Sequence, residues 1–84
     1  MSQVKVLGSG CANCQRLTAL TEQALAELGQ TIEVEKVTDY TQIAAYGVMS
    51  TPALVVDEQV LMAGRIPALN TLKDALAERL AMVA

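Results

Sequence analysis

Residues 4–14 read Val4-Lys5-Val6-Leu7-Gly8-Ser9-Gly10-Cys11-Ala12-Asn13-Cys14, and in this stretch a strand-like run gives way to a helical one. The turn at 8–10 is rich in glycine, which lets the backbone come close to a reacting sulfur. Unsatisfied backbone N–H groups and the positive end of the helix dipole favour the thiolate of a cysteine at a helix start. Cys11 is therefore the predicted nucleophile. Cys14, one turn into the helix, is the predicted resolving thiol.

The composition predicts one domain with an aliphatic core. A chain of 84 residues is too short for two independent cores, so we expect a single domain over residues 1–84. Hydrophobic residues make up 52% of the chain although Phe and Trp are absent, so Leu, Val, Ile, Ala and Met must form the core. The net charge is −3, with six Lys and Arg scattered among nine acids. This pattern argues against nucleic acid as a partner.

The same composition predicts a cytoplasmic protein that does not insert into a membrane. No apolar run approaches the ~20 residues that span a bilayer. The N-terminus enters a strand pattern directly and lacks a signal-peptide core and cleavage site. In a reducing cytosol, a lone Cys-x-x-Cys pair favours catalysis or metal binding over a structural disulfide.

Periodicity predicts three helices and four strands. The predicted strands are 3–7, 32–37, 53–56 and 60–63, and the helices lie over 12–28, 39–46 and 67–83. Gly29 is expected to cap the first helix at its C-terminus, Asp39 to open the second, and Pro67 to occupy the first turn of the third. The last helix carries one apolar stripe, namely Leu69, Leu72, Leu76, Leu80 and Val83.

The resulting order β-α-β-α-β-β-α predicts an α/β fold. The first β-α-β unit implies two parallel strands joined by a right-handed crossover. The hairpin around 57–59 adds antiparallel strands, which gives a mixed four-stranded sheet flanked by helices on both faces. A Cys-x-x-Cys near a β-α-β pattern is typical of redox proteins.

Several residues have both a plain and a functional interpretation. Pro52 is a strand-entry proline, trans by base rates, or a cis-proline that places its loop against the disulfide. Gly64 is a turn glycine, or a close backbone approach to the site. Lys5 and Arg16 are most simply solvent-facing. Tyr46, Val48 and Met49 are core or hinge residues, or an apolar rim that docks partners.

With Cys11, Cys14 and Thr51-Pro52 in this element order, the chain resembles the thioredoxin superfamily. It is most similar to small thioredoxin-like, glutaredoxin-sized proteins described as redox-active disulfide proteins. The stretches that carry the resemblance are 6–14, 46–54 and 63–67. Two features differ from thioredoxins proper: Gly10 stands where they have Trp, and Lys5 lies near the position of their buried Asp.

The resemblance implies a thiol–disulfide oxidoreductase or dithiol electron carrier, with Cys11 and Cys14 as the catalytic pair. Pro52 would be the cis-proline, and Thr51 would present backbone groups to an extended substrate segment. Gly64 would complete the docking surface. We expect no cofactor or metal beyond the Cys11–Cys14 disulfide. The expected partners are a protein disulfide and a reductase or small-thiol reductant, and the protein is expected to act as a monomer.

Two other hypotheses use different features of the chain. The same cysteine pair could bind a soft metal or metalloid such as Cu(I) or arsenite, as in a copper chaperone. Structural zinc in a single chain is disfavoured, because such sites take four ligands, usually Cys or His, and the chain has two Cys and no His. Two-coordinate Cu(I), or a soft ion shared between two chains, stays open. The third hypothesis is a noncatalytic adaptor that docks partners through the rim at 46–49.

Overall fold

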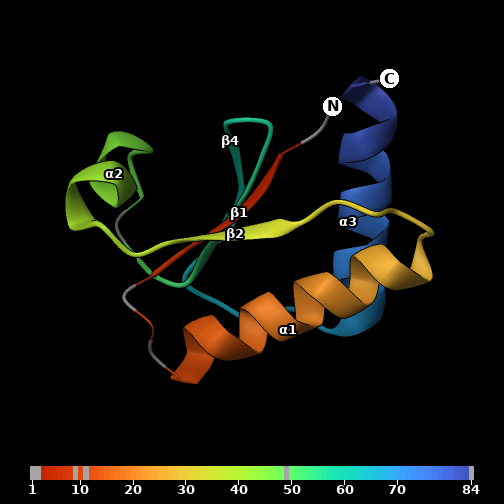
Figure 1. Ribbon diagram of the computed structural model, residues 1–84, viewed down its shortest axis with the longest axis horizontal. Coiled ribbons are helices and arrows are strands. Elements are labelled where there is room, and N and C mark those ends of the chain that lie inside the picture. The colour runs from red at the N-terminus through yellow and green to blue at the C-terminus, as the bar shows by residue number, and fades with distance from the viewer. Residues whose placement is uncertain (1–2, 9, 11, 49, 84) are drawn as a thin grey trace.

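The structure is a computed structural model that describes residues 3–8, 10, 12–48 and 50–83, with side chains as far as Leu80. Within these residues the elements follow the order predicted from the sequence (Figure 1). They are β1 (Val4–Leu7), α1 (Ala12–Glu27), β2 (Val34–Val37), α2 (Tyr40–Ala45), β3 (Ala53–Val56), β4 (Gln59–Ala63) and α3 (Leu69–Val83).

The strands form one mixed sheet in the order β2-β1-β3-β4. β1 runs parallel to β2, with Val4 opposite Val34 and Leu7 opposite Val37. β3 pairs antiparallel with both β1 and β4. The predicted four-stranded mixed sheet is therefore confirmed, and β1 lies inside it between β2 and β3.

The β3–β4 hairpin turns at Asp57 and Glu58, which have φ values of 50° and 69°. A two-residue loop with both residues at positive φ matches the right-handed twist of the flanking strands. Asp57 also ties the turn to the start of β1, because its N–H donates to Gln3 O and its Oδ1 accepts from Gln3 N, each at 2.8 Å.

The helix ends follow the predicted caps at Gly29 and Asp39. Gly29 has a φ of +74°; its N–H donates to Ala26 O at 3.1 Å, and the next N–H, of Gln30, donates to Leu25 O at 2.9 Å. These two bonds form a Schellman motif that satisfies the last carbonyls of α1. At α2, Asp39 Oδ1 accepts from Thr41 N at 2.8 Å.

The start of α3 differs from the prediction. The helix begins at Leu69, and its first turn is closed by Leu72 N donating to Ala68 O at 2.9 Å. Pro67 therefore precedes the helix instead of occupying its first turn. Leu72 and Leu76 of the predicted stripe are fully buried, whereas Leu69 and Leu80 are partly buried.

Hydrophobic side chains cover both faces of the sheet, as predicted. α1 and α3 pack together on one face (Figure 1). Their buried side chains and those of the sheet form the larger cluster, which consists of Val4, Val6, Leu17, Ala24, Leu25, Leu54, Val56, Leu72 and Leu76. On the other face the shorter α2 contributes Ile43 to a second cluster, whose other members are Leu7, Val37, Ala53 and Val55. Neighbouring residues of β1 and β3 alternate between the two clusters because strand side chains point to opposite faces.

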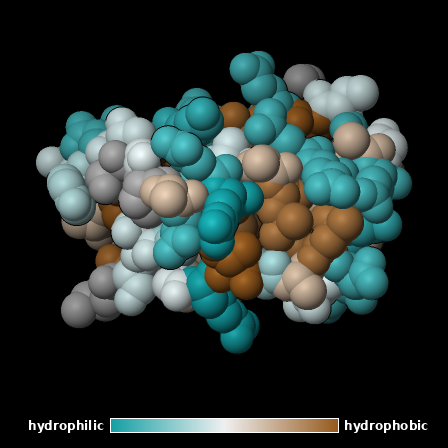
Figure 2. All heavy atoms as spheres, turned by 90° about the horizontal axis from the view of Figure 1, so that it is seen from below, coloured by the Kyte–Doolittle hydropathy of each residue, from teal (hydrophilic) through white to brown (hydrophobic). Residues whose placement is uncertain are grey.

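Some hydrophobic side chains near α1 and α3 remain exposed at the surface. Figure 2 shows hydrophobic residues at the surface, between hydrophilic ones, in the half of the molecule that these helices occupy. Partly buried residues such as Leu20 and Leu69 pack against the cluster from its edge. Among the described residues, no helix is long and apolar enough to cross a membrane.

Candidate functional site

Cys14 lies in the first turn of α1, and its side chain is buried with 5% of its surface exposed. One turn later, Thr18 Oγ1 donates to the carbonyl oxygen of Cys14 at 3.0 Å. The predicted nucleophile, Cys11, lies outside the described residues. That Cys11 is the more accessible of the two cysteines therefore stays a prediction.

Cys14 packs against the backbone of Gly8, the residue that follows β1. A β-carbon at Gly8 would overlap Cys14 Sγ and would lie 3.1 Å from Cys14 Cβ. The same β-carbon would lie 3.9 Å from Thr51 Cβ, so Cys14 and Thr51 both adjoin Gly8. The predicted close approach of the backbone to a sulfur is therefore confirmed at Gly8.

The loop before β3 carries the cis peptide bond that the functional interpretation of Pro52 requires. The Thr51–Pro52 bond is cis, Pro52 is buried and Thr51 is exposed. The base-rate alternative, a trans bond, is wrong here.

Gly64 approaches this loop from the end of β4. Its N–H donates to Pro52 O at 2.8 Å, which extends the β3–β4 pairing by one residue. A β-carbon on Gly64 would lie only 2.8 Å from Ser50 Cβ and 3.4 Å from Ser50 Oγ. The structure thus brings together Cys14, Thr51, Pro52 and Gly64, with Gly8 between the cysteine and the loop.

A small cavity of about 90 Å³ opens beside Cys14. Gly8, Cys14, Thr18 and Lys36 are among the residues that line it. Lys36 was not singled out from the sequence, because a lysine in an alternating strand is indistinguishable from any solvated charge.

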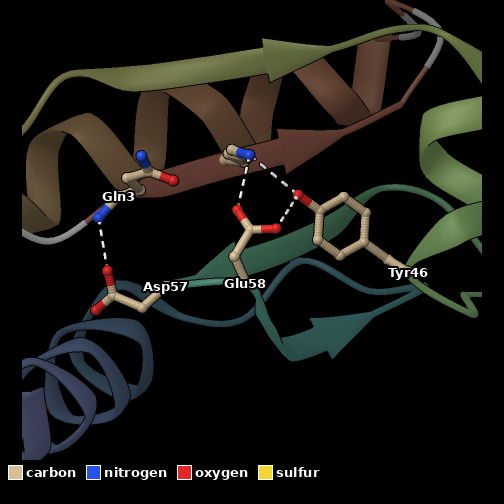
Figure 3. Close-up of polar contacts among 5 residues, drawn as sticks. Gln3, Tyr46, Asp57 and Glu58 are labelled. Carbon is tan, nitrogen blue, oxygen red and sulfur yellow. Dashed lines mark hydrogen bonds and ion pairs between the residues drawn. The ribbon is translucent and has the colours of Figure 1, made fainter.

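A polar network lies on the opposite face of the sheet (Figure 3). Lys5 Nζ donates to Glu58 Oε1 at 2.8 Å and to Tyr46 Oη at 3.0 Å, while the Tyr46 hydroxyl donates to Glu58 Oε2 at 3.0 Å. Lys5 Nζ also lies 5.8 Å from the centre of the Tyr46 ring. Strand alternation places Lys5 on the face away from Val6, and it is Val6 that lines the cavity beside Cys14.

This network corrects the interpretation of Lys5 as solvent-facing. Its side chain is only 19% exposed, against 60% for that of Glu58. The hydrogen bonds to Glu58 and then Tyr46 raise the pKa of Lys5, and the hydrogen bonds from Lys5 and then Tyr46 lower the pKa of Glu58. Tyr46 is half-buried against the second cluster, in agreement with a core position.

The described side chains contain no group of three or more His, Cys, Asp or Glu that could hold a metal ion. The soft-metal hypothesis involves Cys11, which lies outside the described residues.

Comparison with known proteins identifies the family. A model of the thioredoxin domain matches residues 2–77. The chain is 35% identical over 77 residues to a thioredoxin of Methanothermobacter thermautotrophicus, an alignment that covers 92% of this chain and 100% of the relative. It is 33% identical over 76 residues to a thioredoxin of Methanocaldococcus jannaschii, covering 90% of this chain and 87% of that one.

A solved structure, glutaredoxin 1 of Francisella tularensis complexed with cacodylate, aligns with a TM-score of 0.46 and 17% identity, over 98% of this chain and 99% of that one. The assignment rests on the family model and the two thioredoxins. The family model matches residues 2–77, and the two alignments cover 92% and 90% of this chain. The chain therefore belongs to the thioredoxin family of redox proteins.

Proposed function

We propose that this protein is a thiol–disulfide oxidoreductase, or dithiol electron carrier, that cycles Cys11 and Cys14 between dithiol and disulfide. The observation that carries the proposal is the meeting of Cys14 and the cis Thr51–Pro52 loop at Gly8. In a chain of the thioredoxin family, a cysteine of a Cys-x-x-Cys pair that adjoins this loop supports thiol exchange with a substrate whose backbone the loop would bind.

The proposed reaction consists of two thiol exchanges. The Cys11 thiolate attacks one sulfur of a substrate disulfide; the substrate S–S bond breaks, and the leaving thiolate takes a proton from water. The Cys14 thiolate then attacks the Cys11 sulfur. This forms the Cys11–Cys14 disulfide and releases the second substrate thiolate, so that the substrate gains two electrons. A reductase or small-thiol reductant returns the protein to the dithiol.

The substrate would dock along the loop at Thr51. Thr51 is exposed, whereas Pro52 behind it is buried and its carbonyl oxygen is bonded to Gly64 N. An extended segment of a protein disulfide could therefore add to Thr51 in the manner of an extra β-strand. Gly64 would hold the loop in place from behind.

The remaining parts of the proposal concern partners and location. The protein would act as a monomer in the cytoplasm, on protein disulfides, without nucleic acid and without a cofactor other than its own disulfide. The soft-metal alternative gains no support from the relatives, which are described as thioredoxins.

A disulfide reductase assay with serine variants tests this function. Cys11→Ser should lose dithiol-dependent reduction, and Cys14→Ser should accumulate a mixed disulfide on Cys11, detectable as a mass increase that a reductant removes. The variant with both cysteines replaced serves as the control for chemistry elsewhere in the chain. Full reductase activity in Cys11→Ser would show that the assigned mechanism is wrong. Stoichiometric binding of Cu(I) or arsenite without any disulfide reduction would favour the metal module instead.

A further inference from the structure

We propose that Gly8 is a positioning residue for the second exchange, because its missing side chain is what lets the Cys14 sulfur sit against the end of β1. This inference rests on the proposed function. It adds a role for a residue that makes no covalent contact with substrate.

Gly8 is glycine for space and not for backbone freedom. Its φ does not lie in the left-handed region, unlike that of Gly29 or Gly64. Its backbone conformation is therefore open to any residue, and the reason for glycine must be sought in what surrounds it.

What surrounds it is Cys14. A β-carbon at Gly8 would overlap Cys14 Sγ, and turning the sulfur away would not remove the conflict, because Cys14 Cβ would still lie 3.1 Å away. Thr51 Cβ would lie 3.9 Å from the same β-carbon, an ordinary van der Waals contact. The added methyl group would thus overlap Cys14 while it contacts the cis-proline loop at Thr51.

The backbone at Gly8 is held in place. Its N–H donates to Val37 O at 2.9 Å, which fixes it to the end of β2, and Gly8 itself is buried. Cys14 is held by α1, where the neighbouring Leu17 and Thr18 are also buried. Gly8 and Cys14 both line the cavity of about 90 Å³, so open space adjoins this contact.

Displacement of this sulfur would affect one exchange and not the other. Attack on the substrate disulfide uses Cys11 alone. Attack on the mixed disulfide requires the Cys14 thiolate to lie in line with the bond between Cys11 and the substrate sulfur. A misplacement of about 1 Å in such a step can cost about a hundredfold in rate.

Single-turnover kinetics with a symmetric aromatic disulfide separate the two exchanges, because each releases one coloured thiolate. In Gly8→Ala, the first release should keep the wild-type rate, and the second should slow by about a hundredfold. The mixed disulfide should accumulate and be visible by mass spectrometry. Gly29→Ala is the matched control: it strains a backbone at φ +74° with nothing within 4 Å of the added carbon. It should lose stability while leaving both releases unchanged.

Each outcome decides the matter. A second release at the wild-type rate in Gly8→Ala would overturn the positioning role and leave the proposed function intact. The absence of either release in the wild type would overturn the proposed function itself. If Gly8→Ala does not fold, the combined Gly8→Ala and Cys14→Gly variant removes both the sulfur and the β-carbon that the added methyl group would meet, with Cys14→Gly alone as the control for a glycine in α1. Recovery of folding supports the contact with Cys14, and continued failure to fold overturns it.

Discussion

Gly64 differs from Gly8 because both its backbone angle and its surroundings require glycine. Its φ is +78°, and an added β-carbon would lie 2.8 Å from Ser50 Cβ. A side chain there would push on the loop that leads into the cis Thr51–Pro52 bond. The two glycines therefore flank the same site, Gly8 on the cysteine side and Gly64 on the loop side.

We expect Gly64→Ala to lower the free energy of unfolding by about 1–3 kcal/mol through backbone strain, with a further loss from the contact with Ser50. Urea unfolding followed by circular dichroism measures the total loss in free energy of unfolding. Gly29→Ala is again the control, because it has the strain without the contact. Adding Ser50→Gly should recover the difference between the two variants. An equal loss in Gly64→Ala and Gly29→Ala would mean that the Ser50 contact has no energetic weight.

At the scale of elements, the network of Lys5, Tyr46 and Glu58 joins three parts of the fold. Lys5 comes from β1, Tyr46 follows the end of α2, and Glu58 lies in the β3–β4 turn. Tyr46 begins the segment that leads to Thr51, and β1 leads to Gly8. The network therefore connects the two chain segments that meet at the site, although it lies on the other face of the sheet.

The network predicts an acid-dependent stability that Glu58→Gln should remove. The pKa of Glu58 is lower in the folded protein, chiefly because of the hydrogen bond from Lys5. A lowered folded pKa means that the stabilisation is present above the unfolded value of about 4.3 and is lost as the pH falls through the folded value. Wild type should thus be more stable than Glu58→Gln at neutral pH, and the two should converge in acid.

Urea unfolding midpoints of both proteins across the acid range check this expectation. Glu22→Gln, which removes an exposed acid from α1, is the control for the loss of one negative charge. Because Glu58 is largely exposed, added salt should shrink its effect. Stability curves for Glu58→Gln and wild type that stay parallel down to low pH would exclude a role for this carboxylate.

At the scale of the whole molecule, the two hydrophobic clusters lie on opposite faces of the same sheet. Leu72 of α3 is fully buried in the larger cluster, whereas Leu80 lies at its edge. We expect Leu72→Ala to lower the free energy of unfolding by about 2–5 kcal/mol, since it removes a buried side chain and leaves a cavity. Leu80→Ala should lower the free energy of unfolding by a clearly smaller amount.

The same unfolding experiment tests the expectation of one domain. The chain has no Trp, so circular dichroism and the absorbance of its two Tyr residues are the natural probes. Coincident transitions by the two probes, both shifted by Leu72→Ala, indicate one cooperative unit. Separate transitions would show that the face covered by α2 unfolds independently.

Sequence reasoning worked best where a signal is local. Gly29 and Asp39 cap the helices as predicted, because capping depends on residues within one turn of the helix end. It failed for Lys5, whose partners Tyr46 and Glu58 are distant in sequence and meet it only across the sheet. It placed α3 two residues early, because Pro67 fits before a helix as well as inside its first turn.

The sequence by itself determined the order of elements, the mixed sheet and the cysteine pair, since these depend on periodicity and on residue types with special chemistry. Only the tertiary structure decided what meets at Gly8. A glycine without a positive φ carries no local signal, and its purpose appears only when α1 brings Cys14, and the loop before β3 brings Thr51, to the same point. Contacts between segments far apart in sequence depend on how the sheet and helices pack, which no short stretch encodes.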